Sequence, residues 1–275
     1  MLDLTNLEVE IASLARDLPP FPKIVIQLLD LLRNEDASLD ELARLAKNDP
    51  VISSNILGTA NRLRRMQAKS DIDDPFIAAS LIGVNQVRRI VSTVGMNKFL
   101  GDGKGNEFLF NHSRAVAIVA QELAMLCGVS PEKAYVVGIL HDIGQLCFHI
   151  RNPDVFQALY QKSAVDGQLL ERETAVFGLD HAKVGALLAD FWRLPDDFVY
   201  AIQSHHDDTV VKSKLQAVIN IAESLTRALD IPASPKNRLN KLNVAAIESL
   251  GIVWDSPAMM DCFGRCRARF RQGMT

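Results

Sequence analysis

The feature that most constrains this chain is the segment 134–148, AYVVGILHDIGQLCF, a nearly apolar run with a His and an Asp side by side near its middle. Ser130 offers an N-cap oxygen and Pro131 suits the first helical position, so the run predicts one buried helix. Burying His141 and Asp142 in that helix costs free energy unless both are paired or coordinate something. For the dipeptide alone, a buried His–Asp hydrogen bond is the simplest explanation, so the rest of the chain must decide what the pair faces.

Composition narrows the class of protein. The 275 residues are 48% hydrophobic and 23% charged, with a net charge of −3, which is ordinary for a globular protein with a large core. The charge argues against a strongly basic nucleic-acid binder, so we expect no specific nucleic-acid partner. We find neither a signal peptide nor an apolar run of about 18 residues. The sequence therefore predicts a cytoplasmic protein without a membrane span.

Signals for helix starts recur along the chain. They are the pairs Asp49–Pro50 and Asp74–Pro75, the capping box of Ser38 with Glu41, and the capping residue Asp180. Between these signals the apolar residues recur with a helical period, and no segment alternates as a strand does. We therefore predict an all-α fold of short helices joined by short turns.

A glycine cluster at residues 101–105 predicts a joint between two lobes. We expect a larger helical lobe at 106–228, packed on a smaller N-terminal helical lobe at 14–100, and then a C-terminal helical extension at 229–275. The extension carries arginines at 265, 267, 269 and 271, and this spacing spreads them around a helix. We expect them to form a solvated surface, with contact to a phosphate or an acidic partner as the alternative.

The histidines all lie after the glycine cluster, at positions His112, His141, His149, His181, His205 and His206. They fall on successive predicted helices, so their imidazoles could converge on one cavity. Imidazoles with one or two carboxylates suit Zn, Fe, Mn, Co or Ni rather than Ca²⁺. Separate core and capping histidines are the alternative, but five together beside a buried Asp favour a metal. His149 stands apart, near a helix end where its charge suits the helix dipole.

The order of these residues resembles the ligand series of the HD superfamily of metal-dependent phosphohydrolases. The segment 138–144, GILHDIG, resembles the motif that gives the superfamily its name. The superfamily's final acid lies in an apolar helix, where this chain has Glu223. The resemblance implies one or two divalent transition-metal ions. A one-metal site would use His112, His141, Asp142 and Glu223; a two-metal site would add His181, His205 and His206, with Asp142 bridging.

The first half of the chain resembles the HDOD domain, the regulatory branch of this superfamily. The resemblance rests on the segments 18–32, LPPFPKIVIQLLDLL, 49–63, DPVISSNILGTANRL, and 81–91, LIGVNQVRRIV, and on Glu173 and Gly178 in the second half. It covers residues 14–228. It implies an all-helical protein of bacterial signalling, a branch in which many members have lost catalysis. Signalling proteins are then the expected partners, and a nucleotide or other phosphate the expected ligand.

Three departures from the active cyclic-dinucleotide phosphodiesterases of the superfamily bear on activity. Gln145 stands where those enzymes carry a lysine, residues 207–211 (DDTVV) replace their GYP motif, and Glu223 replaces an Asp. The metal ligands are kept while the phosphate-handling residues are lost. We therefore expect a regulatory protein that retains its metal site. An active phosphohydrolase cleaving a nucleotide or other phosphate ester, with Asp142 as its catalytic residue, is the alternative, and a metal-free scaffold is a third hypothesis.

Overall fold

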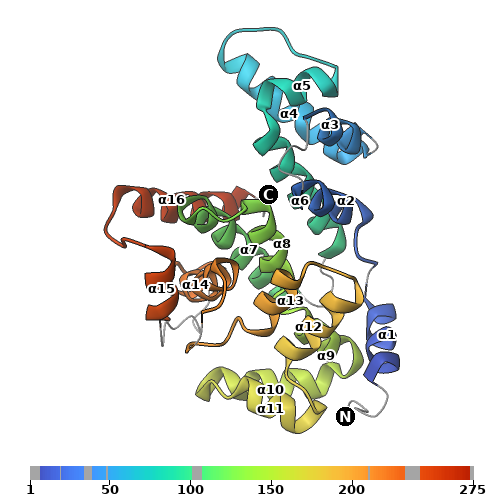
Figure 1. Cartoon of the computed structure of the whole chain (residues 1–275), viewed down its shortest axis with the longest axis vertical. Helices are drawn as coiled ribbons and strands as arrows, with labels where there is room; N and C mark the ends of the chain where they lie inside the picture. The colour runs from blue at the N-terminus through green and yellow to red at the C-terminus, as the bar shows by residue number, and fades with distance from the viewer. Residues whose placement is uncertain are drawn as a thin grey trace. The chain divides into compact units, whose positions relative to one another are not determined.

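The structure is a computed structural model, which describes residues 7–18, 20–33, 39–47, 49–100, 107–209, 211–232 and 242–272. These residues form the helices α1 to α16 and contain no strand, which confirms the all-α prediction (Figure 1). The predicted capping box at Ser38 and the glycine cluster at 101–105 lie outside the described residues. The chain divides into two compact units, a smaller unit at 21–101 and a larger unit that combines 1–20 with 102–275.

In its described residues, the smaller unit has five helices around one apolar core. They are α2 (Lys23–Arg33), α3 (Leu39–Lys47), α4 (Pro50–Met66), α5 (Pro75–Ile82) and α6 (Val84–Leu100). Leu28, Leu42 and Ile56 are fully buried in that core. The predicted starts of α4 and α5 are confirmed, because Asp49 and Asp74 each accept hydrogen bonds from backbone N–H groups of the first helical turn.

The larger unit is organised around α7 (Glu107–Cys127). Its other helices are α1 (Leu7–Asp17), α8 (Pro131–Leu140), α9 (Ile143–Arg151), α10 (Pro153–Asp166), α11 (Leu169–Phe177), α12 (His181–Phe191), α13 (Asp196–Gln203), α14 (Lys214–Ala228), α15 (Val244–Leu250) and α16 (Pro257–Gln272). Helices α8, α14 and α16 pack directly on α7. The middle of α7 is buried all round, from Ala115 to Ala120, as expected of a central helix.

The prediction of one helix over Ala134–Phe148 is wrong at its centre. Helix α8 ends at Leu140 and α9 begins at Ile143, so His141 and Asp142 form the turn between two helices. The predicted start is right, because the Ser130 hydroxyl accepts a hydrogen bond from the Lys133 backbone N–H at 3.3 Å. Hydrophobic periodicity misses the break because the residues on both sides of it are buried.

Two glycines of the segment GILHDIG set how closely the neighbouring helices approach this turn. A Cβ on Gly138 would lie 2.5 Å from the Ala117 Cα, so α8 meets the backbone of α7 there. A Cβ on Gly144 would lie 2.2 Å from the backbone oxygen of His181, at the start of α12. Because only glycine fits at such distances, these positions bring α7 and α12 against the two sides of the His141–Asp142 turn.

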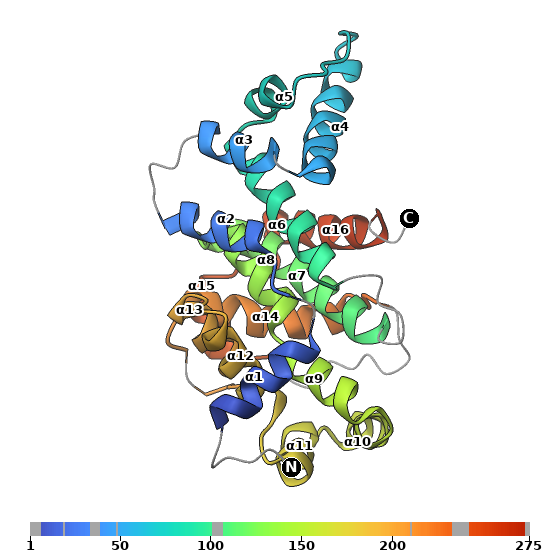
Figure 2. The same ribbon diagram turned by 90° about the vertical axis from the view of Figure 1, so that its right-hand side faces the viewer.

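Helix α1 lies beside α9 and α12 in both views of the ribbon (Figures 1 and 2). Arg151 at the end of α9 reaches it, with its Nε donating to the Asp17 carboxylate at 2.9 Å and its Nη1 donating to the Glu10 carboxylate at 3.3 Å. The described residues between 14 and 20, which the sequence prediction assigned to the N-terminal lobe, therefore belong to the larger unit. The predicted domain limits at residues 14 and 228 stay predictions.

The C-terminal helix α16 is held to α7 by a buried charge. Glu122 is fully buried in α7, and its two carboxylate oxygens accept hydrogen bonds from Arg265 Nε and Arg269 Nη1, both at 2.6 Å. The expectation of a solvated arginine surface is wrong for these two residues, which lie four apart and so share one helix face. Burial raises the pKa of Glu122, but the two arginines outweigh it and hold that pKa below its ordinary value.

Replacing Glu122 should therefore destabilise the larger unit. We expect Glu122→Gln to lower the free energy of unfolding by about 2 kcal/mol near neutral pH, less than for a fully buried pair because both arginines are partly exposed. Because the folded pKa of Glu122 is lowered, its contribution is present above about pH 4.3 and is lost as pH falls through the folded pKa. Urea unfolding followed by circular dichroism measures both effects.

The exposed residue Glu248 in α15 provides the matched control. Glu248→Gln should change the free energy of unfolding by less than about 0.5 kcal/mol. A Glu122→Gln variant as stable as this control, or one whose deficit is unchanged in acid, would contradict the role of the Glu122 pair.

Candidate metal centre

The structure brings all seven predicted site residues together from five parts of the larger unit. His112 lies in α7, His141 and Asp142 in the turn before α9, His181 at the start of α12, His205 and His206 in the turn after α13, and Glu223 in α14. They form two adjoining groups, Asp142 with His181, His205 and His206, and His112 with His141 and Glu223. Within each group every residue offers a ligand atom within 4.8 Å of the others. Their role as ligands stays a prediction.

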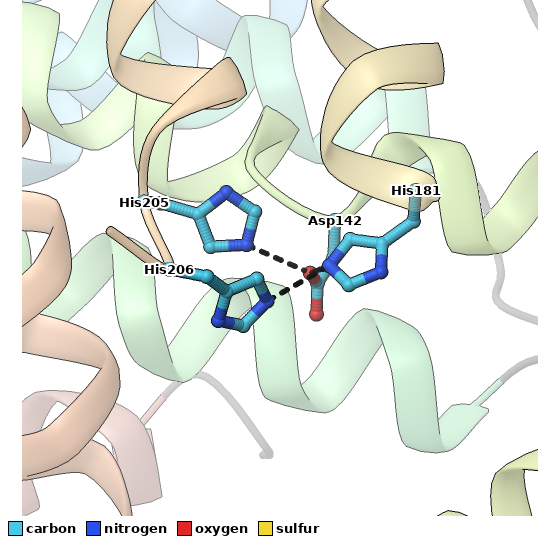
Figure 3. A group of neighbouring side chains, drawn as sticks. All are labelled: Asp142, His181, His205 and His206. Atoms are coloured by element: carbon cyan, nitrogen blue, oxygen red, sulfur yellow. Dashed lines mark hydrogen bonds and ion pairs between the residues drawn. The ribbon is translucent and has the colours of Figure 1, made fainter. Parts of the chain in front are cut away.

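Asp142 stands between the two groups. Its Oδ1 lies 3.2 Å from His181 Nε2 and 3.5 Å from His205 Nε2 (Figure 3). Its Oδ2 lies 3.3 Å from His141 Nε2 and 3.6 Å from His112 Nε2. One carboxylate oxygen therefore faces each group, the arrangement that a carboxylate needs to bridge two ions.

The Asp142 carboxylate faces the imidazoles although its position at the start of α9 would allow it to cap that helix. Asp142 is the N-cap residue of α9, yet its side chain makes no capping hydrogen bond. The N-cap aspartates 49, 74 and 180 all cap their helices. An N-cap Asp normally stabilises a helix by about 1 kcal/mol, so the Asp142 carboxylate forgoes that contribution and faces the imidazoles instead.

Three of the histidine rings are oriented by hydrogen bonds on the side away from the centre. His141 Nδ1 lies 2.8 Å from the Gly138 carbonyl oxygen, and His205 Nδ1 lies 2.7 Å from that of Ile202. His181 Nδ1 lies 2.6 Å from a carboxylate oxygen of Glu173. With Nδ1–H donating to these oxygens, each ring turns its Nε2 to the centre, as metal-binding histidines do.

Glu173 in α11 contacts the predicted site, and the site prediction left it out. Its side chain is fully buried, and Oε2 accepts hydrogen bonds from both the backbone N–H and the ring Nδ1–H of His181. The resemblance to the HDOD domain is one sequence signal of Glu173, which lies eight residues before His181. Helical periodicity offers a second signal, because the residues three and four positions away are apolar and share its helix face, namely Leu169, Leu170, Val176 and Phe177.

The longer side chain of Glu223 still reaches the centre. Its Oε2 lies 2.9 Å from His112 Nε2 and 3.5 Å from His141 Nε2.

Two other residues that the sequence analysis discussed lie outside both groups. Gln145 is buried in α9 with 4% exposure, and His149 contacts the ring of Phe156 edge-on.

The donor set fits a metal ion. Four buried atoms that face one another make no hydrogen bond, namely His141 Nε2, His205 Nε2, Asp142 Oδ1 and Glu223 Oε2. Buried polar atoms are normally paired, so four such atoms together call for a cation. Imidazole nitrogens with carboxylate oxygens are the ligands of Zn, Fe, Mn, Co and Ni.

The pKa values of the histidines and carboxylates in the two groups also favour a bound cation. Burial raises the pKa values of Asp142 and Glu223, but their histidine neighbours, and Arg227 beside Glu223, hold both well below the ordinary range. Burial lowers the pKa values of His141 and His181, but the facing carboxylates outweigh it and raise each pKa to about 10. The pKa values of His205 and His206 are lowered, mainly by burial. A bound cation would take the place of the protons on His141 and His181.

The fold and this centre define an HD-type helical domain with a cluster of histidines and carboxylates. The sequence model of the HDOD domain matches residues 18–208, and the chain belongs to the HDOD domain family.

Solved structures agree with this family. A candidate phosphohydrolase from Shewanella amazonensis SB2B is 27% identical, with 96% of this chain and 95% of that chain covered and a TM-score of 0.66. An HDOD domain protein of unknown function from Geobacter sulfurreducens is 24% identical, with 98% of each chain covered and a TM-score of 0.70. A candidate signal transduction protein from Marinobacter aquaeolei VT8 shares the fold at 18% identity and a TM-score of 0.69, with 100% of this chain and 61% of that chain covered.

The curated relatives that the chain matches are longer proteins. The chain spans less than half the length of each of them. Across the described ranges, no helix combines the length and the apolar character that crossing a membrane requires.

The close contact at Gly144 generates a test of how the centre is supported. We expect Gly144→Ala to lower the free energy of unfolding by about 1–3 kcal/mol, because a methyl group there overlaps the backbone of His181. Thermal unfolding measures the change. The control is Gly264→Ala in α16, where an added Cβ meets nothing within 4 Å and replacing a helical glycine should stabilise by about 0.5–1 kcal/mol. Equal effects of the two substitutions would contradict the close approach.

Proposed function

We propose that this chain is a regulatory HDOD protein of bacterial signalling whose larger unit binds one or two divalent transition-metal ions. The observation that carries the proposal is the set of buried ligand atoms around Asp142 that face one another and make no hydrogen bond. One ion would be held by His112, His141, Asp142 and Glu223. A second would be held by His181, His205 and His206, with Asp142 shared between the two ions.

The surroundings of the metal ligands favour retention of metal over turnover. Gln145 lies one turn after Asp142 and carries no charge, and the turn after His206 continues with two acidic residues, Asp207 and Asp208. A hydrolytic site for a phosphate ester needs cations around the reacting group. We therefore propose a role in the cytoplasm, where metal or ligand occupancy is transmitted to protein partners in signalling.

An active metal-dependent phosphohydrolase is the second candidate. It is favoured by the presence of both groups, since a purely structural site needs only one closed set of ligands. A metal bound there would lower the pKa of a bound water and neutralise phosphate oxygens. Asp142 would then be the catalytic residue. It would orient the metal centre toward the phosphorus of a nucleotide or other phosphate ester.

Metal content tests the proposal directly. The full chain, purified without chelator or affinity metal, should carry at least about one transition-metal ion per chain by mass spectrometry. Asp142→Asn should lose most of this metal, because the variant removes the charge that faces four imidazoles, while its helical circular dichroism is retained. His149→Ala, which changes a histidine outside both groups, should keep the metal.

The same preparations separate the two candidates. A wild-type protein without metal after loading with Mn²⁺ would contradict both and leave the scaffold hypothesis. Turnover of a panel of phosphate esters that disappears in Asp142→Asn would establish the phosphohydrolase and overturn the regulatory proposal. Bound metal without turnover would support the regulatory protein.

Glu173 should act as a positioning residue for His181. We expect Glu173→Gln to weaken metal binding about 10–100-fold, because the amide no longer fixes the His181 ring with a charged acceptor. Competition with a chelating dye measures the affinity. Glu171→Gln, at an exposed position on the same helix, is the matched control and should bind metal as the wild type does. Unchanged affinity in Glu173→Gln would show that His181 is not a ligand or needs no such support.

A further inference from the structure

Helix α4 of the smaller unit, which Figure 2 shows along its length, has one side in the core and the other in solvent. Its core side carries the fully buried residues Ile52, Ile56 and Ala60. Its solvent side carries exposed residues at helical spacing, namely Val51, Ser54, Asn55, Gly58, Arg62 and Arg65. An exposed side is ordinary for a helix of this kind, so the residues that it presents decide whether it binds anything.

Gly58 lies in the middle of this side, where the smaller unit itself has no need of a glycine. A Cβ built on Gly58 would meet no atom within 4 Å, so no neighbouring element requires the space. Its φ is not among the positive values that glycine alone adopts readily. Because glycine weakens a helix interior relative to alanine, its presence here lacks a reason within the fold. A second backbone approaching α4 at this point would supply one.

The missing side chain leaves an open groove on the surface of α4. The groove is lined by Gly58 and by residues of the next two turns, namely Asn61, Arg62, Arg65 and Met66. The amide of Asn61 accepts from the backbone N–H of Ile72 at 2.7 Å and donates to the Ile72 carbonyl oxygen at 2.9 Å, so this wall is fixed. Met66 is 80% exposed, and methionine and arginine are both enriched at protein interfaces.

The groove is positively charged, although the whole chain has a net charge of −3. The charged residues between positions 51 and 71 are Arg62, Arg64, Arg65, Lys69 and Asp71. In the described part of the chain no hydrogen bond or ion pair of Arg62 is recorded. Arg65 pairs with Asp71, but the two side chains are 71% and 46% exposed, so water screens this pair and another carboxylate can compete for the guanidinium.

We propose that this groove is a docking surface for an acidic amphipathic helix of a partner protein. Carboxylates of the partner pair with Arg62 and Arg65, and a small or apolar residue lies over Gly58 against Met66. The glycine lets the two helix axes approach at the short end of the usual 8–10 Å range. The proposal rests on the proposed function only in taking a protein as the partner, and it needs no metal ion.

A nucleic acid fits the groove less well than an acidic helix does. Phosphate chains are bound by surfaces with a large excess of positive charge, whereas this chain is acidic overall. Single strands also stack their bases on aromatic rings, and the residues lining the groove include none. Met66 instead supplies an apolar wall beside the two cations, which suits a segment with both apolar and acidic residues.

Peptide selection tests the docking surface. A displayed library of helical peptides of about 18 residues, randomised on one side, is selected on the immobilised full chain. We expect the selected peptides to carry Asp and Glu beside a seam of small and apolar residues. Arg62→Glu should bind them about 10-fold more weakly by fluorescence anisotropy and should prefer versions with Lys at the acidic positions. Arg44→Glu, which changes an exposed arginine in α3 of the same unit, should bind as the wild type does.

Gly58→Gln separates docking from folding. The variant should unfold at a Tm at or above that of the wild type, because its side chain meets open space and glutamine favours a helix, yet it should bind the peptides at least about 10-fold more weakly. Wild-type affinity in Gly58→Gln or in Arg62→Glu, selected peptides without an acidic excess, or tighter binding of DNA than of any peptide would overturn the docking surface. Because the peptides bind without metal, these failures leave the metal centre standing, and a chain without metal leaves the docking surface standing.

Discussion

The larger unit depends on one electrostatic constraint, which is that the Asp142 carboxylate is buried and must be neutralised. Three imidazole nitrogens from three separate parts of the chain lie within 3.6 Å of its two oxygens, besides that of the adjacent His141. An uncompensated buried charge costs several kcal/mol, so helices α7, α12 and the turn after α13 must all be in place before Asp142 is satisfied. The carboxylate thereby couples the packing of these helices to the integrity of the centre.

Backbone contacts make this convergence possible. Gly138 and Gly144 flank the His141–Asp142 turn and let α7 and α12 approach it at distances that no side chain would permit. Glu173 then fixes the first residue of α12 through both its backbone and its ring. The centre is therefore a product of close helix packing as much as of ligand chemistry. That combination explains why a segment as short as GILHDIG is informative.

Much of this architecture could be predicted from local signals, and the rest could not for physical reasons. The caps at Asp49, Asp74 and Ser130 act within one helical turn, so sequence reveals them. The break at His141–Asp142 lies inside a continuous apolar run, where periodicity gives no sign of it. The pairing of Glu122 with Arg265 spans 143 residues and is invisible to local patterns. The convergence of the histidines could be predicted from their places on successive helices, but the full set of seven, with Glu223, only because their order resembles a known series.

Glu223 links the candidate metal ligands to the surface of the unit. One of its oxygens faces His112 and His141, and the other accepts from Arg227. A cation on the first oxygen and the guanidinium on the second would share one negative charge, so each would weaken the other's contact with Glu223. By linkage, this effect is the same in both directions. A carboxylate shared in this way would let an exposed residue respond to the occupancy of a buried site.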